Sequence, residues 1–106
     1  MSWATLADPR AYIGRADGDG SVIVQADGEP PYVLDGATWG GDAGDRRAVA
    51  AAILHDVLGR TANQSIVDAF HQDVVATLPG HGFVLTAGDV RSWLLLRAVG
   101  RLPADG

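Results

Sequence analysis

The apolar residues between positions 45 and 58 recur with the period of an α-helix. At about 100° per residue, they cover roughly half of the helix circumference, and they comprise Val49, Ala50, Ile53, Leu54, Val57 and Leu58. Ala51, Ala52 and His55 fall outside this arc. Because so wide an apolar stripe cannot face water, the pattern predicts a helix over 45–58 at the centre of the core. Gly59 is suited to the left-handed conformation that commonly follows a last turn.

A second helical pattern runs from 63 to 78. Its apolar side chains lie within about 120° of one another, and they are Ile66, Val67, Phe70, Val74 and Leu78. Pro79 and Gly80 are typical of a helix end. Only residues 60–62 separate this pattern from the first helix and its Gly59, so we expect the two helices to be antiparallel neighbours.

A third helix is predicted over 87–99. Thr86 can cap it, and Asp89 follows three residues later, in the position of a capping box. The expected core face consists of Val90, Trp93, Leu94 and Ala98, and the further apolar positions around the helix are Leu95, Leu96 and Val99. This surplus of apolar surface indicates either a contact with a partner or a helix clamped between the sheet and the helix pair.

Short apolar runs with a period of two precede the first helix. They predict strands over 11–15, 21–25 and 32–34, separated by turns rich in Asp, Gly and Pro at 17–20 and 27–31. Asp35 and Gly36 are expected to turn the chain towards Trp39. A further run, 82–86, predicts a short strand before the last helix, and it can pair with the others.

The order of these elements indicates the α+β class. We expect an N-terminal antiparallel three-stranded β-meander, a three-helix layer packed on one face, and one short strand before the last helix. A single domain covers 1–106, divided into an arm (1–10), the meander (11–36), the helical part (45–99) and a tail (101–106).

The composition supports a folded domain and narrows its chemistry. Apolar residues make up 47% of the 106 residues, and the chain has three Trp. Cysteine is absent, which excludes disulfides and thiolate metal ligands. No apolar run approaches the roughly 20 residues of a membrane span, and the start lacks the basic region of a signal peptide. We therefore expect a cytoplasmic protein with no membrane partner.

The net charge of the chain is negative, and nearly all charged residues are Arg or Asp. The formal net charge is −5, all eight basic residues are Arg, and Asp supplies twelve of the thirteen acidic residues. Affinity for a phosphate backbone comes from clustered cations, whereas here only Arg46 and Arg47 are adjacent. Nucleic acid is therefore a disfavoured partner.

A glycine-rich loop at 39–45 enters the first helix, where backbone N–H groups could hold a phosphate. The loop has no Lys, and no Ser or Thr follows Gly44, so it is not a Walker-type loop. Asp42 and Asp45 would repel an anion, and either can cap the helix instead. The favoured interpretation is a strand-to-helix turn, and whether residues 40–45 hold a ligand is left open.

No residue pattern indicates a catalytic or metal centre. His55, His71 and His81 do not converge, and a zinc site needs three or four ligands. The Asp-rich turn at 17–20 begins like a calcium loop, but Gly28 stands at the position of the bidentate Glu. The serines lack a nucleophile elbow. We therefore predict no catalytic residues, no metal and no cofactor, with an acid–base pair of Asp or His residues as the alternative left open.

Three stretches together resemble a known family. They are Trp39-Gly40-Gly41-Asp42-Ala43-Gly44, then residues 69–79 (AFHQDVVATLP), then Phe83-Val84-Leu85-Thr86 with Asp89-Val90-Arg91-Ser92-Trp93-Leu94. In this order and spacing they look like the small prokaryotic and phage domain of unknown function numbered 6166, over roughly Tyr12 to Leu95. The chain departs from the family pattern in its shorter glycine loop with aspartates, and in His71-Gln72 at a basic position. The resemblance implies a phage or mobile-element accessory gene and no particular activity.

The leading hypothesis is a non-enzymatic accessory domain that works by protein–protein contact, including self-association as a homodimer. Its expected contact residues are Trp3, Trp93, Leu96 and Val99. One alternative is a nucleic-acid-binding module, in which the last two helices form a distorted helix-turn-helix and Arg91 and Arg97 face a phosphate. A second alternative is a small hydrolase that depends on Asp and His residues.

Overall fold

The computed structural model describes residues 10–16, 20–26, 28–40 and 43–100, leaving out the side chains of 43–45 and 98–100. The elements follow in the order β1 (Ala11–Arg15), β2 (Ser21–Ala26), β3 (Glu29–Thr38), α2 (Ala43–Leu58), α3 (Gln64–Asp73), the 3-10 turn η1 (Val75–Thr77), β4 (Gly82–Thr86) and α4 (Ala87–Gly100). The α+β class predicted from the sequence is confirmed.

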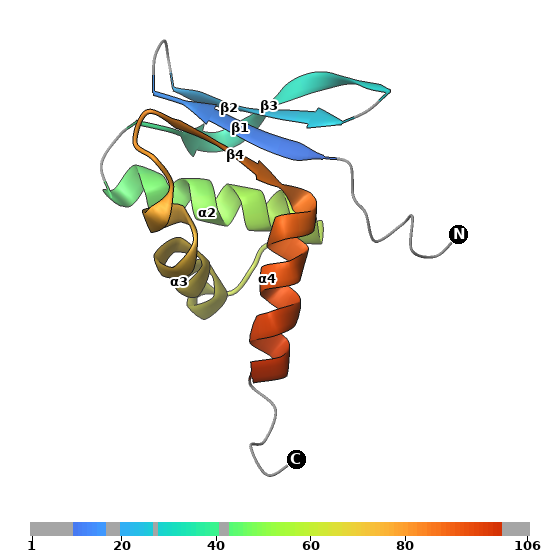
Figure 1. Cartoon of the computed structure of the whole chain (residues 1–106), viewed down its shortest axis with the longest axis vertical. Helices are drawn as coiled ribbons and strands as arrows, with labels where there is room; N and C mark the ends of the chain where they lie inside the picture. The colour runs from blue at the N-terminus through green and yellow to red at the C-terminus, as the bar shows by residue number, and fades with distance from the viewer. Residues whose placement is uncertain (1–9, 17–19, 27, 41–42, 101–106) are drawn as a thin grey trace.

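The four strands form one antiparallel sheet in the order β3-β2-β1-β4 (Figure 1). β1 pairs with β2 and β2 with β3, whereas β4 joins on the other side of β1. The β1–β4 register runs from Ala11 opposite Thr86 to Arg15 opposite Gly82. A segment from the C-terminal part of the chain therefore completes the sheet next to its first strand.

Alternation along the strands gives the sheet a buried face and an open face. Tyr12, Val22 and Val24 are buried, as are Phe83 and Leu85 of β4. The intervening apolar positions turn to the open face, and they are Ile13, Ile23, Val33 and Val84.

β3 is longer than the sequence predicts, and the predicted turn at Asp35 and Gly36 is wrong. Both residues lie inside the strand, which continues to Thr38. Gly36 adopts a φ of +78°, and the pairing with β2 shifts register, so the chain bends without leaving the sheet. β3 is also an edge strand. Pro30 and Pro31 are tolerated there because one side of an edge strand needs no partner.

α2 is the buried helix that the apolar stripe predicts. Its fully buried side chains are Val49, Ala50, Ile53 and Leu54. The helix packs against β3, and α3 and α4 pack on α2 in turn (Figure 1). α2 begins at Ala43, two residues before the predicted start. Gly59 has a φ of +74° and donates its N–H to the His55 carbonyl at 2.8 Å, which confirms the predicted helix end.

The second helix is shorter than predicted. α3 ends at Asp73, and Val74 leaves the helical region with φ −120° and ψ −62°. The 3-10 turn that follows buries Val75 in the core, whereas Val74 is only partly buried. The predicted helix over 63–78 is therefore wrong beyond Asp73, because a change of backbone path at Val74 turns a different valine into the core.

Trp39 connects the glycine-rich loop to the core. Its ring is buried, and its Nε1 donates to the Pro79 carbonyl at 3.2 Å. The Arg46 guanidinium covers the ring at 4.5 Å from its centroid. These contacts give the start of the loop a packing role. The predicted helix caps, Asp42 and the side chain of Asp45, lie outside the described residues.

Candidate functional site

α4 carries most of the residues that the sequence assigns to a binding surface. It starts at the end of β4 and runs away from the sheet, so its second half extends past α2 (Figure 1). The Asp89 N–H donates to Thr86 Oγ1 at 3.0 Å, and the Thr86 N–H donates to Asp89 Oδ2 at 3.2 Å. This reciprocal pair confirms the predicted capping box and determines where α4 begins.

Trp93 is held against the domain by three neighbours. Its ring packs edge-on to Phe70 with 5.1 Å between centroids, and its Nε1 donates to Asp73 at 3.2 Å. The Arg97 guanidinium lies 5.6 Å from the ring centroid. Trp93 therefore anchors α4 on α3, and only part of its surface is available to a partner.

The apolar surface that α4 presents to solvent centres on two leucines. Leu95 is 66% exposed and Leu96 is 70% exposed. The structure thus places Leu96 at the surface and adds Leu95, which the sequence pattern marks as surplus apolar surface. The other two predicted contact residues are not described, because Trp3 and the side chain of Val99 lie outside the described residues.

The two arginines predicted to face a phosphate both contact the protein. Arg91 Nη2 donates to the Val57 carbonyl at 3.3 Å, at the C-terminal end of α2, where a cation complements the helix dipole. Arg97 Nη1 lies 4.0 Å from Asp73 Oδ2, and its Nε atom is buried. Both side chains therefore take part in packing α4 against its neighbours.

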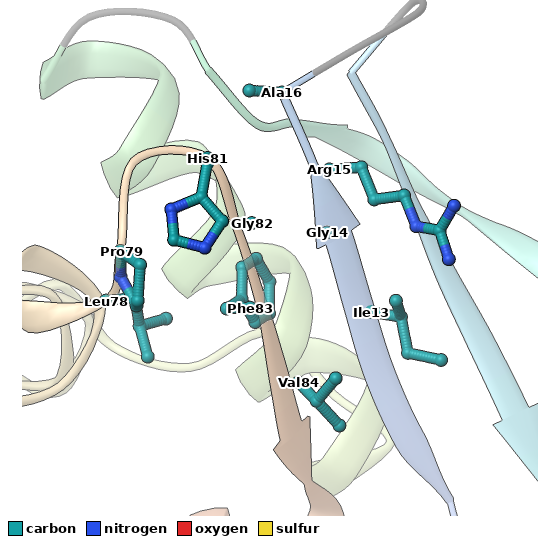
Figure 2. A pocket seen from close by; sticks show the side chains of 10 residues that line it. All are labelled: Ile13, Gly14, Arg15, Ala16, Leu78, Pro79, His81, Gly82, Phe83 and Val84. Atoms are coloured by element: carbon teal, nitrogen blue, oxygen red, sulfur yellow. The ribbon is translucent and has the colours of Figure 1, made fainter.

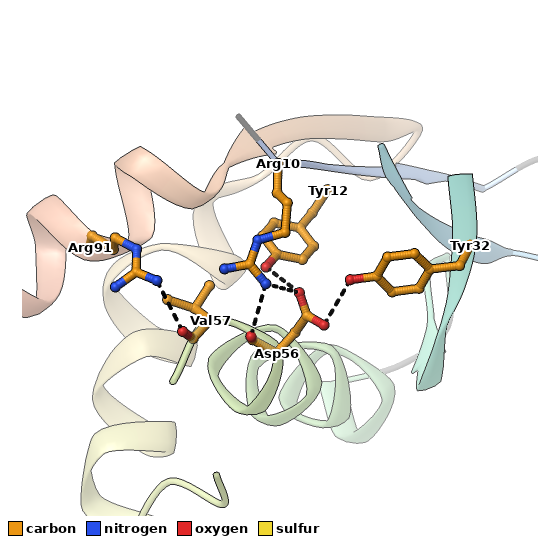
Figure 3. A network of polar contacts seen from close by, with 6 residues as sticks. All are labelled: Arg10, Tyr12, Tyr32, Asp56, Val57 and Arg91. Carbon is orange, nitrogen blue, oxygen red and sulfur yellow. Dashed lines mark hydrogen bonds and ion pairs between the residues drawn. The ribbon is translucent and has the colours of Figure 1, made fainter. Parts of the chain in front are cut away.

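A polar network between α2 and the sheet was not predicted from the sequence (Figure 3). The Asp56 carboxylate accepts hydrogen bonds from the Tyr12 hydroxyl at 2.6 Å, the Tyr32 hydroxyl at 2.9 Å and the Arg10 guanidinium at 3.0 Å. One acidic side chain thus connects β1, β3 and the residue before β1. Arg10 falls in the predicted arm, yet it is part of the fold, since its carbonyl also accepts from the Ala87 N–H at 2.9 Å.

The surroundings keep both tyrosines of this network protonated. Burial raises the pKa of Tyr12, and the hydrogen bond and negative charge of Asp56 raise it further. The same causes, in the same order, raise the pKa of Tyr32. A protonated phenol donates a hydrogen bond and cannot act as a base. The Asp56 carboxylate accepts hydrogen bonds from the two tyrosines and Arg10, and it thereby joins α2 to the sheet.

The sequence contains only a partial signal for this network. Asp56 lies about 20° outside the apolar arc of α2, at the border of the core, where a carboxylate needs partners. Tyr12 is in phase with the buried positions of its strand. Neither pattern identifies the other residue, because the two are 44 positions apart.

An open cavity of about 1000 Å³ lies beside β1 and β4 (Figure 2). Its lining includes Ile13, Arg15 and Val84, together with Pro79 and His81 from the turn before β4. Figure 2 shows the Arg15 side chain extending away from His81. Because these two polar side chains do not converge, the cavity offers neither an acid–base pair nor a clamp for an anion.

The family of the chain follows from a match over most of its length. A family model described as a family of unknown function, DUF6166, matches residues 12–96, which are 85 of the 106 residues. The chain belongs to DUF6166. The resemblance seen in the sequence is thereby confirmed. No curated protein and no solved structure matches the chain.

The DUF6166 match contains the main features of both sites. It begins at Tyr12 and ends at Leu96, so Tyr12, Tyr32 and Asp56 of the polar network and the exposed leucines of α4 lie within it, whereas Arg10 precedes it. Trp3 and Val99 lie outside the match. Of the four predicted contact residues, Trp93 and Leu96 therefore lie inside the match.

The described part of this DUF6166 domain contains no cluster of side chains that could bind a metal ion. There, no group of three or more His, Asp or Glu residues is placed to hold a metal ion. His55 is exposed on α2, His71 is partly buried on α3, and His81 is exposed before β4. None of the helices in these same residue ranges combines the length and apolar character needed to cross a membrane.

Proposed function

We propose that this DUF6166 domain is a non-enzymatic accessory module that works in the cytoplasm by protein–protein contact, with α4 as its contact surface. The observation that carries the proposal is the exposure of two adjacent leucines, Leu95 at 66% and Leu96 at 70%, in the second half of α4. Covering a fully exposed leucine stabilises a complex by about 1.5–3 kcal/mol, so this surface gains from a partner.

The base of α4 supports the proposal because it holds the contact surface in place. Trp93 packs on Phe70 and donates to Asp73, and the capping box of Thr86 and Asp89 orders the first turn. An ordered surface loses less conformational entropy on binding than a flexible one. A helix that presents apolar side chains from an ordered base suits an apolar groove or a second helix in its partner.

The family resemblance supplies the biological setting of this proposal. The segments shared with the family imply a phage or mobile-element accessory gene, so we place the partner among the proteins of that element or its host. The formal net charge of −5 favours a partner with a neutral or basic rim around its apolar contact surface, because like charges repel across an interface.

A paired substitution tests the proposal. The variant Leu95→Asp with Leu96→Asp puts two carboxylates on the proposed contact surface, and Val33→Asp, at a β3 residue that is 55% exposed, is the matched control. Tagged forms of each protein are used to capture partners from host lysate. We expect wild type and Val33→Asp to retain the same partner, and the leucine variant to lose it. Identical capture by all three proteins would overturn the proposal.

The nucleic-acid alternative has less support from the positions of the cations. Arg47 Nε donates to Asp68 at 2.7 Å, and Arg46 covers the Trp39 ring. Arg91 contacts the end of α2, as described above. These side chains already have partners within the domain. A gel shift at low salt tests this alternative, and retarded DNA or RNA would favour it over protein contact.

The hydrolase alternative would place a histidine beside a carboxylate that is free to act. His55 does line a cavity of about 390 Å³ together with Asp35 and Asp56. Asp56 already accepts three hydrogen bonds, and neither aspartate is hydrogen-bonded to His55 within the described residues. Hydrolysis of a generic ester by wild type that is lost in His55→Ala would favour this alternative.

A further inference from the structure

β4 forms one edge of the sheet, and the ladder to β1 shows which of its backbone groups face outward. The Ala16 N–H donates to the His81 carbonyl at 3.1 Å, and the Ala87 N–H donates to the Arg10 carbonyl at 2.9 Å, at the two ends of this ladder. Pairs that exchange hydrogen bonds alternate with pairs that do not. The residues whose N–H and C=O face the free edge are therefore Gly82, Val84 and Thr86.

Val84 is the open position of this edge. The Gly82 N–H donates to the Pro79 carbonyl at 3.2 Å, and the Thr86 N–H donates to Asp89 at 3.2 Å. No turn or side-chain hydrogen bond of this kind occupies Val84 in the described part of the chain. Its side chain is also 68% exposed, so another strand has access to it.

The two edges of the sheet differ in their protection. β3 contains two prolines, two acidic residues and a bend at Gly36. Such features prevent an edge strand from pairing with another chain. β4 has the sequence GFVLT, without charge or proline. The β3 edge is therefore blocked, whereas the β4 edge is suited to strand addition.

The open face of the sheet carries an apolar row that ends at this edge. The registers place Val33 opposite Ile23, Ile23 opposite Ile13, and Ile13 opposite Val84. Four β-branched side chains thus stand in line across the four strands, and Val33 and Val84 at the ends are 55% and 68% exposed. A fifth strand at β4 with a β-branched residue opposite Val84 would continue the row.

We propose that a second copy of this chain pairs antiparallel with β4 around a two-fold axis at Val84. Val84 then exchanges two N–H···O=C bonds with Val84 of the partner subunit, which satisfies the open backbone groups of both copies. The apolar row continues across the joint into the partner sheet. The occupant is the chain itself because β4 is self-complementary about Val84, since the same free groups and the same side chain lie on both sides of the axis.

The surroundings of β4 fit this pairing. Gly82 lies opposite Thr86 of the partner subunit, and because Gly82 has no side chain, the cavity of Figure 2 leaves room for that threonine. Arg15 lies beside Gly82, and Asp89 contacts Thr86. Arg15 therefore lies two strand spacings, about 10 Å, from Thr86 of the partner subunit, whose N–H is bound by the Asp89 carboxylate of the same subunit. Opposite charges at both ends of an uncharged joint offset the repulsion between two acidic chains.

Sedimentation measurements on edge variants test the proposal. Val84→Pro removes the outward N–H without touching the ladder to β1, and proline is tolerated at that kind of edge position. Val84→Lys places a charge on the edge, and Val33→Lys is the matched control at the other end of the row. Circular dichroism checks that each variant is folded. If Val84→Pro does not fold, Val84→Lys alone is compared with wild type.

Wild type should move from 11.0 kDa towards twice that mass between about 10 μM and 1 mM protein, the range of a weak association. We expect Val33→Lys to associate as wild type does. Both Val84 variants should stay monomeric over this range, because their association is at least about tenfold weaker than that of wild type. Exchange of the Val84 amide should slow with concentration, whereas exchange at Phe83 and Leu85 should not. A wild type that stays monomeric at 1 mM, or dimers that survive Val84→Lys, would overturn the proposal.

The pairing edge of β4 and the contact surface on α4 lie on different elements. The same sedimentation measurement shows which of the two mediates self-association. The variant Leu95→Asp with Leu96→Asp leaves β4 unchanged, so it should keep the concentration-dependent mass of wild type. A dimer that is lost in this variant but kept in Val84→Lys would overturn pairing at β4, and it would support α4 as the surface of self-association.

Discussion

Tyr12 and Asp56 are joined by a hydrogen bond of 2.6 Å between the phenol hydroxyl and carboxylate Oδ2, which connects the first strand to the last turn of α2. The Tyr12 side chain is fully buried, so no bulk water is present to replace the carboxylate. Tyr32 reaches the same carboxylate from β3 and is 44% exposed. The two tyrosines therefore make chemically alike contacts in different surroundings, which allows a controlled comparison.

Tyr12→Phe should destabilise the domain by about 1.5–3 kcal/mol, because hydrogen bonds to charged groups contribute about this much when water cannot replace them. Tyr32→Phe is the matched control, and it should cost only about 0.5–1 kcal/mol because water can reach the carboxylate from that side. Urea unfolding followed by tryptophan fluorescence measures both changes. Equal losses for the two variants would contradict the assigned role of burial.

The same tyrosines should make the domain sensitive to alkali. The fold raises the pKa of Tyr12 above its ordinary value of 10.0. Below pH 10 both the folded and the unfolded chain keep the proton, and the contribution of Tyr12 is complete. Above about pH 10 the unfolded chain loses its proton first, so the free energy of unfolding falls by about 1.4 kcal/mol per pH unit. The raised pKa of Tyr32 acts with the same sign.

Urea unfolding at several values between about pH 9 and 11.5 checks this dependence. We expect the free energy of unfolding to be nearly level below pH 10 and to fall above it, with a shallower fall in Tyr12→Phe. If wild type and Tyr12→Phe lose stability with the same slope, the decrease arises from other groups and the role given to Tyr12 is wrong.

Local patterns predicted the parts of the fold that depend on neighbours in sequence. The apolar arc of α2 required only the helical period, and its end at Gly59 required only a residue free to take a positive φ. The capping box needed two polar residues three positions apart, and the structure places Thr86 and Asp89 as expected. The exposed leucines of α4 likewise followed from more apolar positions than one core face can cover.

Features that depend on distant partners could not be predicted in this way. The turn expected at Gly36 became a bend inside β3 because pairing with β2 continues beyond it. The second helix was expected to continue, but Val74 takes a different backbone conformation and Val75 fills the core. The network at Asp56 requires a β-strand residue 44 positions earlier. In the first two cases tertiary contacts override a local preference, whereas in the third no local pattern identifies the partner.

The capping box allows a prediction about the start of α4. Thr86→Ala removes the acceptor for the Asp89 N–H, and loss of an N-cap side chain costs about 0.5–2 kcal/mol. Because the first turn of α4 also carries Val90, which is fully buried, we expect faster amide exchange in that turn as well as a lower midpoint of unfolding. Thr86→Ser keeps the acceptor and should restore most of the loss. A serine variant as unstable as the alanine variant would show that the hydroxyl is not the cause.

A close approach between β1 and β4 allows a last prediction, at Gly14. Gly14 pairs with Phe83, and a Cβ added at Gly14 would lie 2.2 Å from an edge carbon of that ring. The ring cannot move aside easily, because it is buried and packs edge-on to Trp39 with 4.6 Å between centroids. Gly14→Ala should therefore destabilise the domain by about 1–3 kcal/mol through overpacking.

The ring itself provides the test of this cause. Phe83→Leu removes Cε2, the ring carbon nearest to a new Cβ at position 14, together with Cζ, at the cost of looser packing against Trp39. In the double variant Gly14→Ala with Phe83→Leu, the added methyl group occupies space that the ring has left. We expect the two losses to be less than additive by about 0.5–3 kcal/mol in a double-mutant cycle of urea unfolding. Strictly additive losses would show that the backbone at Gly14, and not contact with Phe83, requires glycine.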